Sequence, residues 1–206
     1  RAFATATLPY ARNQGEGESR QSFADPSLTG RFTAVMPNIA EPWIPQVQIL
    51  LGHKTARARS IRETQAINVF GTGFPEWRAG VDIWYGLEAV KFGAAWVVSY
   101  PEQRRFGNHD YQPGVARRAT ATIAYSWSPM FKSTLGVNRE QRQEFIIDDE
   151  TQPNSEQINN AAFLNQDVML TPIDAMRFGY SRLAAFGANR NTARSTNVSL
   201  AYMRSF

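Results

Sequence analysis

Few residues in this sequence have the types and spacing that catalysis or metal binding requires. The chain has no cysteine and only two histidines, His53 and His109, so thiolate chemistry is excluded and a histidine-based site has little support. His109 lies within Asn108-His109-Asp110, and an acidic pair stands at Asp148-Asp149. Neither histidine belongs to an HxH or HExxH motif or has an evident serine partner. We therefore expect no enzyme activity, no metal site and no cofactor.

The charged side chains follow a different pattern, because many alternate with apolar residues along short segments. Between residues 76 and 87, one parity is mostly apolar and the other carries Glu76, Arg78 and Asp82. A soluble core could not hold such groups, since an unpaired charge in a low-dielectric interior is costly. They must pair with one another or line water. The residues expected to line this polar interior are Arg78, Asp82, Lys91, Arg118, Lys132, Asp167 and Arg177, joined by Glu76, Asn138, Glu140 and Arg142.

Alternation with a period of two residues indicates β-strands along most of the chain. The clearest segments are 76–87, 90–100, 118–127, 131–139, 162–170, 176–186 and 196–206, and weaker ones cover 2–10, 31–36 and 44–53. Helices are expected to be few or absent, and residues 61–70 fit either a short helix or extended loop strands. The sequence therefore predicts about ten strands.

The connections between these strands alternate in length. Short links cover 37–43, 86–88, 128–130 and 172–173, and long polar ones cover 13–29, 58–74, 102–114, 146–160 and 187–194. A sandwich has no reason to follow this rhythm, whereas bacterial barrels combine short periplasmic turns with long extracellular loops. Aromatic residues at predicted strand ends, such as Trp77 and Trp127, fit interfacial girdles. We predict an all-β fold, one antiparallel up-and-down transmembrane β-barrel formed as a single domain by residues 1–206.

Overall composition is compatible with this fold. The mean hydropathy of −0.39 and the lack of an apolar run of about 18 residues exclude membrane-spanning helices but not barrel strands, which alternate. The net charge of +4 arises from basic residues scattered among acids, so nucleic-acid binding is not expected.

The last eleven residues, Thr196-Asn-Val-Ser-Leu-Ala-Tyr-Met-Arg-Ser-Phe206, alternate down to a terminal aromatic residue. This segment resembles the closing strand of bacterial outer-membrane β-barrels. The resemblance implies that Val198, Leu200, Tyr202 and Phe206 form the signal read by the barrel-insertion machinery, although Arg204 departs from that pattern. It also implies a location in the outer membrane of a Gram-negative-type bacterium, with the lipid bilayer and lipopolysaccharide as partners.

Two further resemblances concern function. Gly71-Thr-Gly-Phe-Pro-Glu-Trp-Arg-Ala-Gly-Val-Asp-Ile-Trp-Tyr-Gly86 and Tyr111-Gln-Pro-Gly114 are similar to the transporter-like outer-membrane family associated with the meta-cleavage pathway of phenol degradation. That resemblance implies uptake of hydrophobic or aromatic compounds. Outer-membrane proteases of the omptin type also use about ten strands, but their paired acids and Asp-x-His arrangement are absent here.

Three functional hypotheses remain open from the sequence. The first is a narrow outer-membrane channel or transporter for small polar, anionic or aromatic solutes. The second is a plugged barrel with a structural or docking role, contacting envelope proteins through loops 102–114 and 146–160. The third is a soluble β-sandwich binding module.

Overall fold

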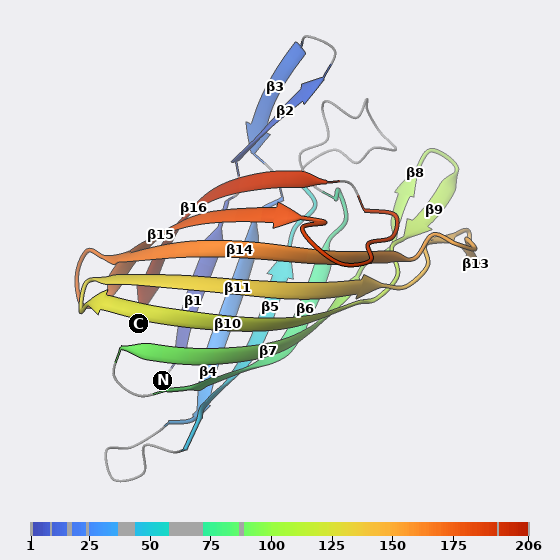
Figure 1. Cartoon of the computed structure of the whole chain (residues 1–206). Helices are drawn as coiled ribbons and strands as arrows, with labels where there is room; N and C mark the ends of the chain where they lie inside the picture. The colour runs from blue at the N-terminus through green and yellow to red at the C-terminus, as the bar shows by residue number, and fades with distance from the viewer. Residues whose placement is uncertain are drawn as a thin grey trace.

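The computed structural model describes the chain except for residues 1, 9, 16–17, 24, 37–43, 58–71, 87–88, 193 and 206. Within the described part, ten strands close a barrel in the order β1-β16-β15-β14-β11-β10-β7-β6-β5-β4 (Figure 1). These are β1 (Ala2–Thr7), β4 (Ser27–Val35), β5 (Gln46–Lys54), β6 (Glu76–Tyr85), β7 (Val90–Pro101), β10 (Ala116–Ser128), β11 (Phe131–Arg142), β14 (Gln157–Met169), β15 (Asp174–Leu183) and β16 (Ser195–Ser205).

Every neighbouring pair in the barrel is antiparallel, and β1 closes the structure by pairing with both β4 and β16. Its pairing with β4 covers six residues, and among the described residues its pairing with β16 covers three, Phe3 with Ser205, Ala4 with Arg204 and Thr5 with Met203. The predicted barrel and its strand number are confirmed, and the β-sandwich alternative is wrong. The expected strand 2–10 ends at Thr7, as fits a sequence in which Pro9 cannot donate to a strand ladder.

Large apolar side chains cover the outside of the barrel. They alternate along the strands with the inward-facing positions, and many are strongly exposed, including Leu51 at 63%, Trp127 at 64% and Val198 at 73%. Trp77 and Tyr100 pair near one end of the barrel, whereas Trp127 and Phe131 lie near the other end. An apolar exterior bounded by aromatic residues is typical of a transmembrane barrel.

The two ends of the barrel differ in the length of their connections. One end, called here the turn side, carries the links between β10 and β11 and between β14 and β15, together with the start of β1 and the end of β16. At the other end, the loop side, the longer connections carry secondary structure. A hairpin of β2 (Tyr10–Gly15) and β3 (Glu18–Phe23) leaves the barrel there (Figure 1).

A small sheet forms a second layer at the loop side. It contains β8 (Arg104–Phe106), β9 (His109–Gln112), β12 (Ile146–Ile147) and β13 (Glu150–Thr151), in the order β13-β12-β9-β8. The expected long loops 102–114 and 146–160 therefore meet in one sheet. No described helix is long and apolar enough to cross a membrane. The prediction for residues 61–70 lies outside the described part of the chain.

Candidate functional site

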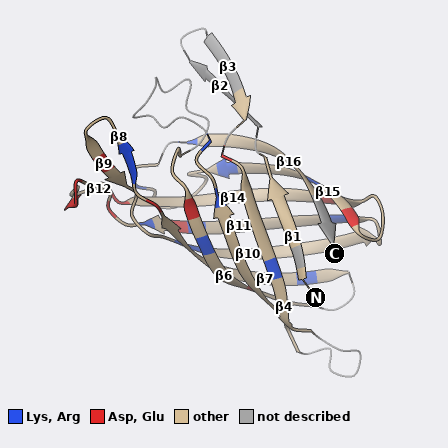
Figure 2. Ribbon diagram, turned by 180° about the vertical axis from the view of Figure 1, so that it is seen from behind, with Lys and Arg blue, Asp and Glu red and all other residues tan. Residues whose placement is uncertain are grey.

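Strand parity places the predicted polar residues on the face opposite the exposed apolar side chains. In β6, Trp77, Ile83 and Tyr85 are exposed, whereas Glu76 and Asp82 are buried. The same alternation assigns one residue set to the inside of the other strands. The seven predicted lumen residues, Arg78, Asp82, Lys91, Arg118, Lys132, Asp167 and Arg177, all have this inward parity. Figure 2 marks charged positions along the strands.

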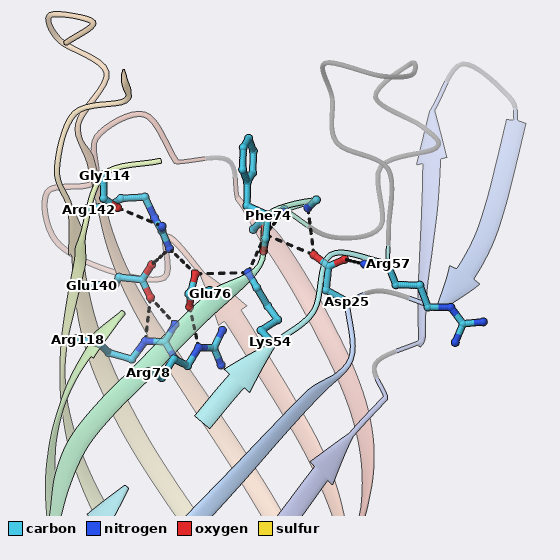
Figure 3. Close-up of polar contacts among 12 residues, drawn as sticks. Asp25, Lys54, Arg57, Phe74, Glu76, Arg78, Gly114, Arg118, Glu140 and Arg142 are labelled. Carbon is cyan, nitrogen blue, oxygen red and sulfur yellow. Dashed lines mark hydrogen bonds and ion pairs between the residues drawn. The ribbon is translucent and has the colours of Figure 1, made fainter. Parts of the chain in front are cut away.

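Inside the loop side of the barrel, six charged residues form one network, the loop-side cluster of Lys54, Glu76, Arg78, Arg118, Glu140 and Arg142 (Figure 3). Glu76 is at its centre. It accepts hydrogen bonds from Arg78 Nε at 2.7 Å and from Lys54 Nζ and Arg142 Nη2 at 3.4 Å. Glu140 binds Arg118, whose Nε lies 2.9 Å from Oε2, and also reaches Arg142. Four cations thus surround two carboxylates.

A second network, the turn-side cluster, joins Arg31, Asp82, Lys132, Asp167 and Arg177. Arg177 binds Asp167 through both ends of its guanidinium group, with Nε to Oδ1 at 2.6 Å and Nη2 to Oδ2 at 2.9 Å. Lys132 Nζ lies 3.2 Å from the same carboxylate. Arg31 Nη1 lies 3.6 Å from Asp82 Oδ2. Three cations therefore accompany two carboxylates, contributed by strands from different parts of the barrel.

In both clusters, several cations are more exposed than the carboxylates they contact, although Lys54 is only 9% exposed and Arg142, at 16%, is covered slightly more than Glu140 at 19%. The side chain of Asp167 is 7% exposed and that of its partner Lys132 is 39% exposed. Asp82 is 9% exposed against 31% for Arg31, and Glu76 is 4% exposed against 28% for Arg78. The carboxylates are thus covered while these cations retain surface open to solvent. A solute inside the barrel meets a more basic surface than the count of charges suggests.

The clusters do not include every predicted lumen residue. Lys91 is exposed near the turn side, and it makes no ion pair with any described residue. Asn138 faces inward at a half-buried position opposite Thr120. Lys91 therefore adds positive charge at the turn-side end of the barrel interior without belonging to the turn-side cluster.

A row of aromatic and small residues, not predicted from the sequence, crosses the inner surface along one line of register. It passes between the two clusters on β11 but starts on β6 at Trp84, two residues to the turn side of Asp82. The register runs Trp84, Gly93, Thr122, Gly136 and Phe163 across five successive strands. A methyl group on Gly136 would overlap the Phe163 ring, and one on Gly93 would lie 3.0 Å from Trp84 Cε3. Each ring therefore occupies the space that a side chain at the paired glycine would need. The shared parity of Trp84 and Asp82 was the available signal.

Asp25 is another contact residue that sequence reasoning missed, since its position in a polar loop gave no signal. Its buried carboxylate accepts hydrogen bonds from the backbone N–H groups of Arg57 at 3.0 Å and Gly73 at 3.1 Å. It also accepts one from Thr72 Oγ1, whose oxygen accepts from Lys54 Nζ (Figure 3). Asp25 thereby connects three loop-side segments to the loop-side cluster.

Four aromatic rings form the base of the loop-side sheet. Phe74, only 5% exposed, contacts Phe106 and Phe145 edge to face, and Tyr111 packs against the same two rings with centroids about 6 Å away. Arg104 stacks over Phe106 and donates from Nη1 to the carbonyl oxygen of Gly73. These contacts hold the sheet against the barrel entrance.

Neither histidine faces the lumen or joins a catalytic arrangement. His53 is on the outward parity of β5 and packs against Trp77, with ring centroids 4.4 Å apart. His109 contacts Asp148 with Nδ1 to Oδ2 at 2.6 Å on the exposed loop-side sheet. Hydrogen bonds from His109 and from the Asp110 backbone N–H lower the pKa of the Asp148 carboxyl. No three potential metal ligands converge among the described residues.

The outer surface carries the expected C-terminal signal residues. Val198, Leu200 and Tyr202 are exposed on the outward parity of β16, and Phe206 lies outside the described residues. Tyr202 also donates its hydroxyl hydrogen to Asp174. Beside the β1 edge, small residues leave a shallow apolar groove of about 410 Å³, lined by Ala2, Ala4, Gly30, Arg31, Phe32, Ile49 and Leu51.

A closed antiparallel barrel with an apolar exterior and a charged interior has the architecture of transmembrane β-barrel proteins. Among solved structures, the chain is similar to an outer membrane channel from Pseudomonas putida F1, with a TM-score of 0.71 and 11% sequence identity over 100% of this chain and 95% of that one. At this identity the likeness concerns the fold, and the predicted outer-membrane barrel fold is confirmed. No family model and no curated protein match the sequence.

Proposed function

We propose that the protein is a narrow outer-membrane channel that passes small anionic solutes, aromatic carboxylates among them, and has no enzymatic role. The observation that carries this proposal is the excess of cations in the two charged clusters, four to two and three to two, where Arg31, Arg78 and Lys132 are more exposed than the carboxylates they contact. Covered carboxylates and open cations create a positive potential along the lumen, which raises the local concentration of anions. The likeness to an outer membrane channel supports a role in permeation.

The inner aromatic row supports aromatic solutes as a subset of these anions. Trp84 and Phe163 are inward-facing aromatic residues on β6 and β14, connected by one line of register. An aromatic carboxylate could place its ring against these surfaces while its charge contacts a neighbouring cation. The two clusters lie toward opposite ends of the barrel, so the negative group meets cations near both ends.

The proposed orientation follows the connection lengths. Short turns of bacterial barrels face the periplasm and long loops face outside. The turn-side cluster would then lie near the periplasmic exit and the loop-side cluster near the external entrance. The protein would belong to the outer membrane of a Gram-negative-type bacterium.

Permeation by the refolded protein tests this function. In planar bilayers with a KCl gradient, the reversal potential should show a preference for chloride over potassium. In liposome uptake, benzoate should enter faster than benzylamine, which has a similar size and the opposite charge. Absence of current from a correctly folded barrel, or faster entry of benzylamine, would overturn the proposal.

A docking role remains the second candidate, because the loop-side sheet gives the barrel a defined external surface. Inner positions such as Ala124 and Ala161 are only 1% exposed, as expected where side chains fill a narrow barrel. A plugged barrel would bind envelope proteins through this sheet. Stoichiometric recovery of a partner, lost when residues 146–151 are replaced by a Gly-Ser linker, together with zero conductance, would favour docking.

A further inference from the structure

Three exposed arginines point outward from the barrel near its loop side. Arg117 on β10 and Arg139 on β11 have the same parity as the exposed apolar residues of those strands. Arg182 is likewise exposed on the outward parity of β15, two residues beyond Tyr180. They are called here the outward arginines. They therefore face the surroundings of the barrel rather than its lumen.

The register places the outward arginines at nearly one level. Arg117 pairs with Gln141, and Arg139 lies two residues closer to the turn side. Arg139 pairs with Asn160, whereas Arg182 pairs with Ala162, again two residues closer to the turn side. Because barrel strands are tilted, a level row shifts by roughly one residue for each strand crossed. From Arg117 on β10 to Arg182 on β15, the position shifts by four residues toward the turn side over three strand-to-strand crossings. This is close to the shift expected for a level row.

The apolar band begins directly on the turn side of this row. The next outward residue on β11 is the exposed Val137, and the next on β15 is Tyr180. On the neighbouring strand β7, Tyr100 lies two residues beyond Val98, which pairs with Arg117. Interfacial aromatic residues of this kind mark the headgroup level of a bilayer. The outward arginines therefore stand where lipid phosphates are found.

These arginines also lack ion pairs with described residues, unlike the cations of the two charged clusters inside the barrel. Over the described part of the chain, Arg117, Arg139 and Arg182 have no carboxylate partner. Their register partners include the neutral residues Gln141, Asn160 and Ala162. The nearby loop cation Arg190, by contrast, binds Glu156. Guanidinium groups bind phosphate through paired N–H donors, and desolvation beside the apolar band strengthens that contact.

We propose that Arg117, Arg139 and Arg182 form a binding site for the phosphate-bearing headgroups of lipids in the leaflet beside the long loops. The apolar residues below the row contact the acyl chains of the same lipid molecules. One lipid with two phosphates could engage Arg117 and Arg139, because diagonal neighbours on paired strands are about 7–8 Å apart. This site is on the exterior, so it is independent of whether the lumen conducts.

Lipid retention measured by native mass spectrometry tests the site. The full chain is refolded in detergent with equimolar bisphosphorylated lipid A and phosphatidylcholine as the added probes, and bound lipids are counted. The wild-type protein should retain lipid A preferentially. The triple variant Arg117→Gln/Arg139→Gln/Arg182→Gln should lose this preference, by on the order of fivefold for each arginine replaced.

A matched variant separates position from charge. The control is the triple variant Arg105→Gln/Arg190→Gln/Arg194→Gln, which removes three exposed charges from the loop side. It should leave lipid A retention within twofold of wild type. Heat-modifiable gel mobility confirms that both variants fold, and single replacements serve if the triple variant does not. Equal retention of the two lipids by wild type, or equal losses in both triple variants, would overturn the proposal. Added inorganic phosphate should compete only weakly, because the site includes the acyl-chain contacts.

Discussion

Replacing Arg177 by glutamine should reduce the anion preference of the lumen. Arg177 is one of three cations in the turn-side cluster, where two carboxylates oppose them. After replacement, the cluster contains equal numbers of positive and negative groups. Since Asp167 is nearly buried beneath Arg177 and Lys132, the lost charge is one that faced the passing solute.

The size of the effect follows from the width of the barrel. The interior of an eight-stranded barrel is already filled by side chains. An ion that passes through a ten-stranded barrel therefore comes within about 6 Å of a lumen cation. At this distance, with the dielectric constant of water, unit charges interact by about 0.7 kcal/mol. When the Arg177 charge is removed, a passing chloride ion loses this much favourable interaction energy. A passing potassium ion is relieved of the same amount of repulsion. The permeability ratio of chloride to potassium should therefore fall roughly tenfold.

The assay is the reversal potential in a KCl gradient across a bilayer of zwitterionic lipid. Arg182→Gln is the matched control, because it removes the same charge from the outward face of the same strand. The double variant Asp167→Asn/Arg177→Gln removes one charge of each sign and should recover the wild-type selectivity. An Arg177→Gln channel with unchanged selectivity, or a control that shifts equally, would refute the electrostatic reasoning.

Three further predictions concern stability. Glu76→Gln leaves Lys54, Arg78 and Arg142 without their common carboxylate, and it should destabilise the barrel by about 3 kcal/mol in urea unfolding; an unchanged midpoint would contradict this. Gly136→Ala should displace the Phe163 ring, which its methyl group would overlap, and cost about 1–3 kcal/mol, with most of the loss recovered in Gly136→Ala/Phe163→Leu. The Asp148 contact should protect the loop-side sheet above the ordinary Asp pKa of about 3.9 and lose that effect as pH falls through the lowered pKa of the folded state. Amide exchange of residues 109–112 should show this loss, and Asp148→Asn should abolish it.

Sequence periodicity predicted the barrel because each wall strand has one lipid-facing and one lumen-facing side. The alternation of Trp77, Ile83 and Tyr85 with Glu76 and Asp82 is enough to assign both faces of β6. Charged lumen residues are recognisable for the same reason. Their partners are not, because Asp167 and Arg177 meet through the register of β14 and β15, which no single segment specifies.

The loop side was less predictable, since its contacts join segments that are distant in the chain. β9 pairs with β12 across more than thirty positions, and two-residue strands are too short to show periodicity. Asp25 reads as an ordinary polar loop residue, although its carboxylate binds the backbone of Gly73. The outward arginines were visible in the sequence, but their common level depends on strand tilt.

The three-residue pairing of β1 with β16 has a consequence for how the barrel forms. Every other wall interface joins wall strands that are consecutive in chain order, whereas this one joins the first described wall strand to the last. Bringing distant segments together carries the largest loop-closure entropy, and three residue pairs return little of it. The wall can therefore assemble as an open sheet from β4 onward, and sealing of the cylinder should be the final and most readily reversed event in its folding.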